Sequence, residues 1–108
     1  MINDAIRSVA SVDRTIHEPT RLLLVAYLAN LRTADFLFLQ QELGLTQGNL
    51  SQHLTKLEVA GYVKVKKSII GKKTRTTYQL TGAGKRAFHD YRQGLKQFLA
   101  QTEGPVSG

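Results

Sequence analysis

The hydrophobic period of this chain changes abruptly at Gly61, and this change limits the folds that the chain can adopt. Before Gly61, the leucines of residues 50–57 recur at the three- and four-residue spacing of an amphipathic helix. After Gly61, Val63 and Val65 alternate with lysines, which is the two-residue period of a half-buried strand. The sequence therefore predicts a mainly α chain with a small β-hairpin, which is an α+β fold.

Capping residues mark two short helices before this change. Thr33 is the expected cap of the first, which ends where Gly44 can adopt a left-handed conformation. Thr46 is the expected cap of the second, which ends at Gly61. Because so few residues connect the two helices, residues 33–61 are a candidate helix-turn-helix.

Similar signals divide the rest of the chain. Pro19 suits the first position of a helix that runs to about residue 31, because its missing N–H would be unpaired there in any case. Residues 75–80 alternate as a second strand, and a turn of Gly71, Lys72 and Lys73 joins it to the first. Thr81 caps a long final helix. We expect one domain over residues 1–103, with the hairpin at 62–80, the last helix at 82–102 and a disordered tail at 104–108.

The net charge of +7 is concentrated in one segment. Residues 59–89 contain eight basic residues and no acidic one, whereas the rest of the chain is close to neutral. A charge excess confined to one stretch makes a local positive field, which attracts a polyanion. The alternative is a solubilising face, but such faces usually mix both signs.

The helix that Thr46 caps carries neutral polar side chains on the side away from its leucines. Amide side chains can bond bidentately to adenine, hydroxyls and lysine can take phosphate, and a glycine lets a backbone come close. A helix surface chosen for stability alone would favour Ala, Glu, Lys and Arg. This composition therefore favours an outside partner, and we expect the apolar Val59 to pack locally near the helix end. The residues on or beside this face are Gln47, Gly48, Asn49, Ser51, Gln52, Thr55, Lys56 and Val59.

Several kinds of chemistry are excluded or disfavoured. The chain has no cysteine, which removes disulfides, thiolate metal sites and thiol nucleophiles. His17, His53 and His89 lack metal-ligand spacing, and we expect His53 to be a hydrogen-bonded residue near the polar face. The stretch TGAGKR lacks the first glycine and the hydroxyl of a phosphate loop. We expect no enzyme activity, no cofactor and no metal.

The sequence also bears on location. The longest apolar run, residues 22–29, is far too short to span a bilayer. The N-terminus shows no signal-like apolar stretch. We therefore expect a cytoplasmic protein with no membrane partner.

Helices near both ends carry apolar stripes at helical spacing. The C-terminal stripe begins at Phe88 and runs past the part of the chain needed to cover one small core. We expect the two helices to pack across a two-fold axis in a homodimer. The candidate interface residues are Ile2, Ile6, Val9, Tyr91, Leu95 and Phe98.

Two segments, QELGLTQGNLSQHLTKLEVAGYVKV and GKKTRTTYQLTGAGKRAF, carry a family resemblance. With the helix that opens at Pro19, they resemble the winged helix-turn-helix transcriptional regulators of the ArsR/MarR-like superfamily, over about residues 16–88. The resemblance implies that the helix after Thr46 is a recognition helix and that the hairpin is the wing. It also implies that a homodimer binds double-stranded operator DNA, with the recognition helix in the major groove and the wing on the backbone or minor groove.

The same resemblance implies which residues contact DNA. Metal-sensing relatives use cysteines or clustered histidines, from which this sequence departs, so a metal effector is not expected. Two other functions remain open. One is a protein-interaction adaptor, which exposed residues such as Leu37, Phe38, Ile69 and Ile70 would favour, and the other is an RNA-binding module.

The implied DNA-binding positions are Thr46, Gln47, Gly48, Asn49, Ser51, Gln52, Lys56, Lys72, Lys73 and Arg75.

Overall fold

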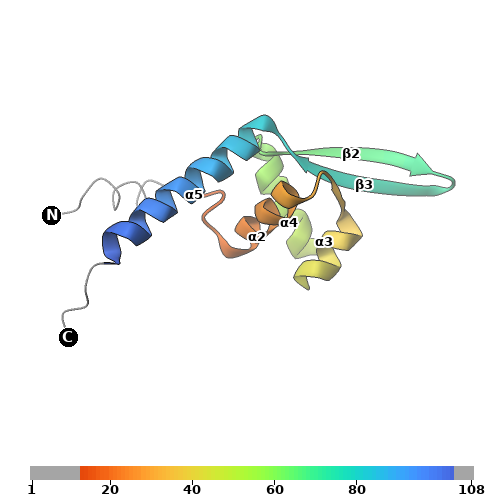
Figure 1. Ribbon diagram of the computed structural model, residues 1–108. Helices are drawn as coiled ribbons and strands as arrows, with labels where there is room; N and C mark the ends of the chain where they lie inside the picture. The colour runs from red at the N-terminus through yellow and green to blue at the C-terminus, as the bar shows by residue number, and fades with distance from the viewer. Residues whose placement is uncertain (1–12, 104–108) are drawn as a thin grey trace.

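The computed structural model describes residues 13–103, which form four helices and a three-stranded sheet (Figure 1). The predicted α+β fold class is confirmed. The N-terminal stripe of Ile2, Ile6 and Val9 and the tail at 104–108 lie outside the described residues. The elements in chain order are α2 (Pro19–Asn30), β1 (Ala34–Asp35), α3 (Phe36–Leu43), α4 (Gln47–Val59), β2 (Val63–Ile70), β3 (Lys73–Leu80) and α5 (Gly82–Thr102).

Side-chain caps begin α2, α4 and α5. Glu18, Thr46 and Thr81 each accept a hydrogen bond from the backbone N–H three residues later, at 2.8, 3.1 and 3.0 Å. Pro19 is the first residue of α2, as its sequence position predicts. Gly44 ends α3 with φ of 62°, in the left-handed region that favours glycine. The predicted caps at Thr46 and Thr81 are therefore confirmed.

The predicted start at Thr33 of the helix that ends at Gly44 is wrong. α3 begins at Phe36, and the Asp35 carboxylate caps it by accepting the N–H three residues later at 2.7 Å. The two residues before the helix are extended because they form β1, which pairs with β3 so that Ala34 lies opposite Tyr78. A pairing with a distant strand therefore decides where this helix begins.

The hairpin lies where it was predicted, within residues 62–80, but its two strands are longer than their alternating pattern predicts. β2 and β3 pair along eight residues each, in a sheet of order β1-β3-β2. Ile70 pairs with Lys73, which leaves Gly71 and Lys72 as a two-residue loop. Gly71 has φ of 65°, the positive value that such a tight loop requires at its first position. Lys73, which we expected in the turn, is therefore the first residue of β3.

The core lies where the helices meet the base of the hairpin (Figure 1). Val63 and Leu80, a cross-strand pair at that base, are buried, whereas the outer half of β2 is mostly exposed. The leucines of α4 face inward, as its periodicity predicts. The buried apolar residues are Ile16, Leu24, Val25, Leu28, Ala34, Leu39, Leu50, Leu54, Leu57, Val63, Leu80 and Tyr91.

The first turn of α5 is fastened to the segment that follows α4. The Thr81 N–H donates to the Tyr62 carbonyl at 3.0 Å, and the Thr81 hydroxyl donates to the Gly61 carbonyl at 2.6 Å. Gly84 approaches the Tyr62 backbone so closely that a Cβ would not fit. These contacts set the direction in which α5 leaves the hairpin.

Candidate nucleic-acid interface

α4 turns its predicted polar face to solvent. Leu50, Leu54 and Leu57 are buried, so the opposite side of the helix faces outward. All of the residues predicted to contact DNA are exposed. These residues are Thr46, Gln47, Gly48, Asn49, Ser51, Gln52, Lys56, Lys72, Lys73 and Arg75.

One flank of α4 faces the hairpin across a concave surface of about 390 Å³. Gln47 and Ser51 line it from α4, and Lys67 and Arg75 line it from the hairpin. Asp35, at the start of α3, lies on the same surface. The structure thus brings three of the predicted residues, Gln47, Ser51 and Arg75, to one place.

An ion pair holds Arg75 in this concave surface. Its Nη2 atom lies 3.5 Å from Oδ2 of Asp35, while the other oxygen of Asp35 caps α3. Both side chains are substantially exposed, so the pair contributes only about 0–1 kcal/mol to stability. Arg75 can therefore exchange this weak partner for another anion at little cost. The role of Asp35 could not be predicted from the sequence, because the pair joins elements that are far apart in the chain.

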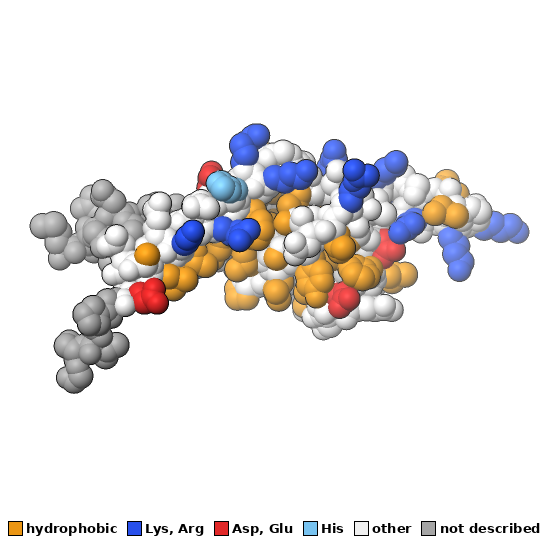
Figure 2. All heavy atoms as spheres, in the orientation of Figure 1, with side chains coloured by type: hydrophobic (Ala, Val, Ile, Leu, Met, Phe, Trp, Pro, Cys, Tyr) orange, Lys and Arg blue, Asp and Glu red, His pale blue; other side chains and the backbone are white. Residues whose placement is uncertain are grey.

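Lys72 and Lys73 form a second, separate part of the interface. They lie at the tip of the hairpin, which projects away from the helices (Figure 1). Lys64, Lys66 and Lys67 along β2 are exposed as well. Figure 2 shows Lys and Arg side chains at this end of the molecule. The basic surface therefore continues outward from α4 along the hairpin.

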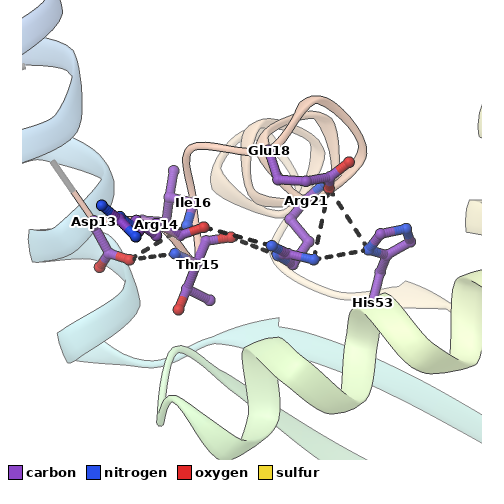
Figure 3. Close-up of polar contacts among 7 residues, drawn as sticks. All are labelled: Asp13, Arg14, Thr15, Ile16, Glu18, Arg21 and His53. Atoms are coloured by element: carbon purple, nitrogen blue, oxygen red, sulfur yellow. Dashed lines mark hydrogen bonds and ion pairs between the residues drawn. The ribbon is translucent and has the colours of Figure 1, made fainter. Parts of the chain in front are cut away.

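A polar network holds α4 against α2 (Figure 3). Arg21 Nη1 donates to His53 Nδ1 at 3.2 Å and lies 3.8 Å from Oε2 of Glu18. Its other nitrogens donate to the carbonyls of Thr15 at 2.6 Å and Arg14 at 3.4 Å. Because a guanidinium only donates, His53 is the acceptor of this hydrogen bond, through Nδ1, which also lies 3.6 Å from Oε2 of Glu18. The prediction of a hydrogen-bonded His53 beside the polar face is confirmed.

Glu18 supplies the negative charge of this network. Burial acts to raise the pKa of its carboxyl, but hydrogen bonds from the Arg21 and Thr20 backbone and the charges of His53 and Arg21 outweigh burial. The pKa of Glu18 therefore lies below its usual value. Glu18 and Arg21 were not among the predicted functional residues. Their spacing of three residues at the start of a helix is the signal that could have found them.

The expectation that Val59 packs locally is wrong. Its side chain is 83 % exposed, because it lies directly opposite the buried leucines of α4. The residues that would favour an adaptor, Leu37, Phe38, Ile69 and Ile70, are also exposed. The outer surface of this region is therefore less uniformly polar than its sequence suggests.

The residues predicted for a dimer interface have different surroundings. Tyr91 is only 8 % exposed and belongs to the core of the single chain, where its hydroxyl pairs with His17 Nδ1 at 2.9 Å. Little of Tyr91 is left for a partner to cover, so we reassign it to the protomer core. Leu95 is half-buried against that core, and Phe98 is half-buried farther along α5.

Among residues 13–103, no three His, Asp or Glu side chains gather where they could hold a metal ion. Within those residues, no helix has both the length and the apolar character needed to cross a membrane. The predicted lack of a metal and of a cofactor stays a prediction.

Two adjacent helices, α3 and α4, followed by a two-stranded basic hairpin, define a winged helix-turn-helix. Residues 20–99 match the family described as winged helix DNA-binding domain, and the chain belongs to that family. The hairpin is accordingly the wing. The family and the fold are those of transcriptional regulators and not of enzymes. The resemblance to winged helix-turn-helix regulators is confirmed.

Known proteins resemble this chain over most of its length. The chain is 41% identical to the uncharacterized protein MJ0432 of Methanocaldococcus jannaschii over an alignment of 83 residues. This alignment covers 77% of this chain and 90% of that protein. A transcriptional regulator homologue from Pyrococcus horikoshii superposes with a TM-score of 0.84 at 27% identity, over 94% of this chain and 100% of that one. The transcriptional repressor BigR of Xylella fastidiosa superposes with a TM-score of 0.59 at 30% identity, over 92% of this chain and 91% of that one.

Proposed function

We propose that this protein is a sequence-specific regulator of transcription that binds double-stranded DNA as a homodimer. α4 is its recognition helix and enters the major groove, while the wing contacts the backbone or the minor groove. The observation that carries the proposal is the exposed polar face of α4 beside a basic wing. Two similar structures are described as a transcriptional regulator homologue and a transcriptional repressor, which supports the regulatory role. Such a regulator works where the DNA is, in agreement with a cytoplasmic location.

The two parts of the interface have different tasks. The lysines of the wing attract DNA of any sequence, because each phosphate contact releases counterions. The amides of Asn49 and Gln52 discriminate between sequences, since a bidentate amide–adenine contact is worth about 1–3 kcal/mol. Gly48 allows the first turn of α4 to come close to the DNA backbone.

A two-fold dimer is the assembly in which we expect the wing and α4 to perform these tasks. α5 continues beyond the core and carries Leu95, Phe98 and the exposed Leu99 on its distal half. Pairing of this half with a second copy would remove apolar surface from water. Two recognition helices related by a two-fold axis would then read half-sites about 34 Å apart, or a near multiple of that spacing. Sedimentation that finds only monomer at micromolar concentration would contradict this assembly.

The central experiment is selection of bound sequences from a random pool of duplex DNA, followed by titrations of the selected site at several salt concentrations. If a dimer neutralises about eight phosphates, log K falls with log salt at a slope near −7. A K72A/K73A variant should bind every sequence more weakly and flatten that slope. Q52A or N49A should instead reduce the preference for the selected site. The assignment of roles is overturned if the lysine pair changes sequence preference while the amides do not.

A second candidate function is a protein-interaction adaptor. Leu37 is 68 % exposed on the concave surface beside α4, and Ile69 is 77 % exposed near the hairpin tip. Such apolar side chains suit a protein surface better than a nucleic acid. Selection that yields no enriched sequence, and no binding to random duplex fragments, would favour the adaptor. Binding that structured RNA displaces more effectively than duplex DNA would favour the RNA-binding alternative.

A further inference from the structure

The two flanks of α4 face different parts of the protein. Gln47 and Ser51 lie on the flank that faces the wing. Lys56 and Ala60 lie on the opposite flank, which faces the loop that leads into α2. On a helical wheel, the outward polar face lies between these two flanks. The exposed face of α4 is therefore bordered by the wing on one side and by this loop on the other.

The loop is held against α4 by Arg21 (Figure 3). The Arg21 guanidinium donates to the carbonyls of Thr15 at 2.6 Å and Arg14 at 3.4 Å, and it bridges to His53 of α4. The Arg21 side chain is only 11% exposed, so it serves as an anchor within the fold. Arg21 binds only the backbone carbonyl of Arg14, so the side chain of Arg14 is free for another role.

Arg14 and Lys56 line one concave surface of about 350 Å³. Both residues are exposed, and neither forms an ion pair with any residue of the segment 13–103. Arg21 lines the same surface, but its charge already has Glu18 as a partner at 3.8 Å, so Arg14 and Lys56 are the two unpaired charges. Like charges gathered without a facing carboxylate repel one another, and an anion placed among them relieves that repulsion.

We propose that Arg14 and Lys56 form a second phosphate site, which binds a backbone phosphate of duplex DNA on the strand across the major groove from the wing. This inference rests on the proposed function, because it takes α4 to be the recognition helix. A helix with its side chains is about 10–12 Å across, and the major groove is about 12 Å wide. Groups on the two flanks of an inserted helix therefore meet the two strands that border the groove. Arg14 adds a planar guanidinium, which can bind phosphate bidentately.

The test uses the full chain and the duplex obtained by selection. R14Q and K56Q each remove one charge per protomer, and R32Q, at an exposed residue between α2 and β1, is the matched charge control. Because R14Q keeps the backbone carbonyl that Arg21 binds, its thermal unfolding should match that of the wild type. In a dimer, each of R14Q and K56Q should reduce the magnitude of the salt slope by about 2, whereas R32Q should leave it unchanged.

A second measurement identifies the strand. Neutral methylphosphonates are placed one at a time along each strand of the duplex, and binding is measured for the wild type, R14Q and K72Q/K73Q. A methylphosphonate at the phosphate that Arg14 contacts should weaken DNA binding by the wild type but not by R14Q. The methylphosphonate to which R14Q is insensitive should lie on one strand of the duplex. The methylphosphonate to which K72Q/K73Q is insensitive, which marks the wing, should lie on the other strand.

The outcomes separate the two proposals. If the wild type does not bind duplex DNA, the proposed function fails and this inference fails with it. If the wild type binds with a steep salt slope but R14Q and K56Q keep that slope, only the second phosphate site is overturned. Insensitivity of R14Q on the same strand as the wing would also overturn it.

Discussion

The backbone carbonyl of Tyr62 occupies the space that a Cβ atom on residue 84 would need. The first turn of α5 can therefore pack against the segment after α4 because residue 84 is glycine. G84A should destabilise the protein by about 1–3 kcal/mol, since a backbone carbonyl cannot move aside as a flexible side chain can. Urea unfolding followed by circular dichroism measures the change.

Gly94, also in α5, provides the control for this prediction. A Cβ at residue 94 would meet nothing within 4 Å, so G94A should be neutral or stabilise the helix by about 0.5–1 kcal/mol. Equal stability changes for G84A and G94A would show that the approach to Tyr62 has no energetic consequence.

Gly48 distinguishes folding from binding. It lies in the first turn of α4, and a Cβ there would meet nothing within 4 Å. G48A should therefore raise the free energy of unfolding by up to about 0.5–1 kcal/mol. If the start of α4 approaches DNA closely, the same variant should bind the selected duplex several-fold more weakly. Unchanged affinity, measured by fluorescence anisotropy, would exclude a close approach of DNA at this position.

Arg21 should be sensitive even to lysine. Its guanidinium reaches two carbonyls and the His53 ring at once, and an ammonium on a single stem cannot reproduce that planar arrangement. R21K should lower the free energy of unfolding by about 1–3 kcal/mol, because it leaves partly buried acceptors unpaired. R14K is the control, since the Arg14 side chain is exposed, and it should change stability by less than about 0.5 kcal/mol.

The pair Tyr62 and Asp13 should make stability depend on alkaline pH. The Tyr62 hydroxyl donates a hydrogen bond to the Asp13 carboxylate, and this bond, together with burial and the carboxylate charge, raises the pKa of Tyr62 from 10.0 to about 12. Because the folded-state value is the higher one, the stabilisation is fully present below pH 10 and is lost as the pH rises through about 12. Y62F should therefore unfold with a weaker pH dependence than the wild type in this window.

An absorbance titration checks the same pair directly. The chain has four tyrosines, and two of them should ionise late in the folded protein, because the pKa of Tyr62 is raised to about 12 and burial also raises the pKa of Tyr78. The ionisation near pH 12 should disappear in Y62F and move to lower pH in D13N. If the tyrosine titration of D13N matches that of the wild type, the hydrogen bond to Asp13 does not control Tyr62.

Much of the fold could be predicted because its signals are local. Thr46 and Thr81 cap helices through an N–H three residues away, and Gly44 takes its left-handed conformation where a helix must end. The inward leucines of α4 follow from helical spacing alone. The exposure of the predicted DNA-binding residues of α4 follows from the same spacing, because fixing the buried face of a helix also fixes the opposite one.

The features that could not be predicted depend on contacts between distant segments. The third helix starts at Phe36 instead of just after Thr33 because the residues before it pair with β3. Tyr91 belongs to the core because α5 packs beside α2 and its hydroxyl reaches His17. Neither the spacing of the residues before Phe36 nor that of Tyr91 indicates its partner, which is β3 for the former and His17 for the latter.

The amino-acid sequence by itself determined the succession of helices and strands, the caps between them and the polar face of α4, since each depends on neighbours within about one helical turn. Tertiary structure decided how that face is bordered. Arg21 fastens the loop of Arg14 to one flank of α4, and the pairing of β1 with β3 sets the wing beside the other. Such contacts form only when the chain closes long loops, so their geometry depends on the packing of the whole domain.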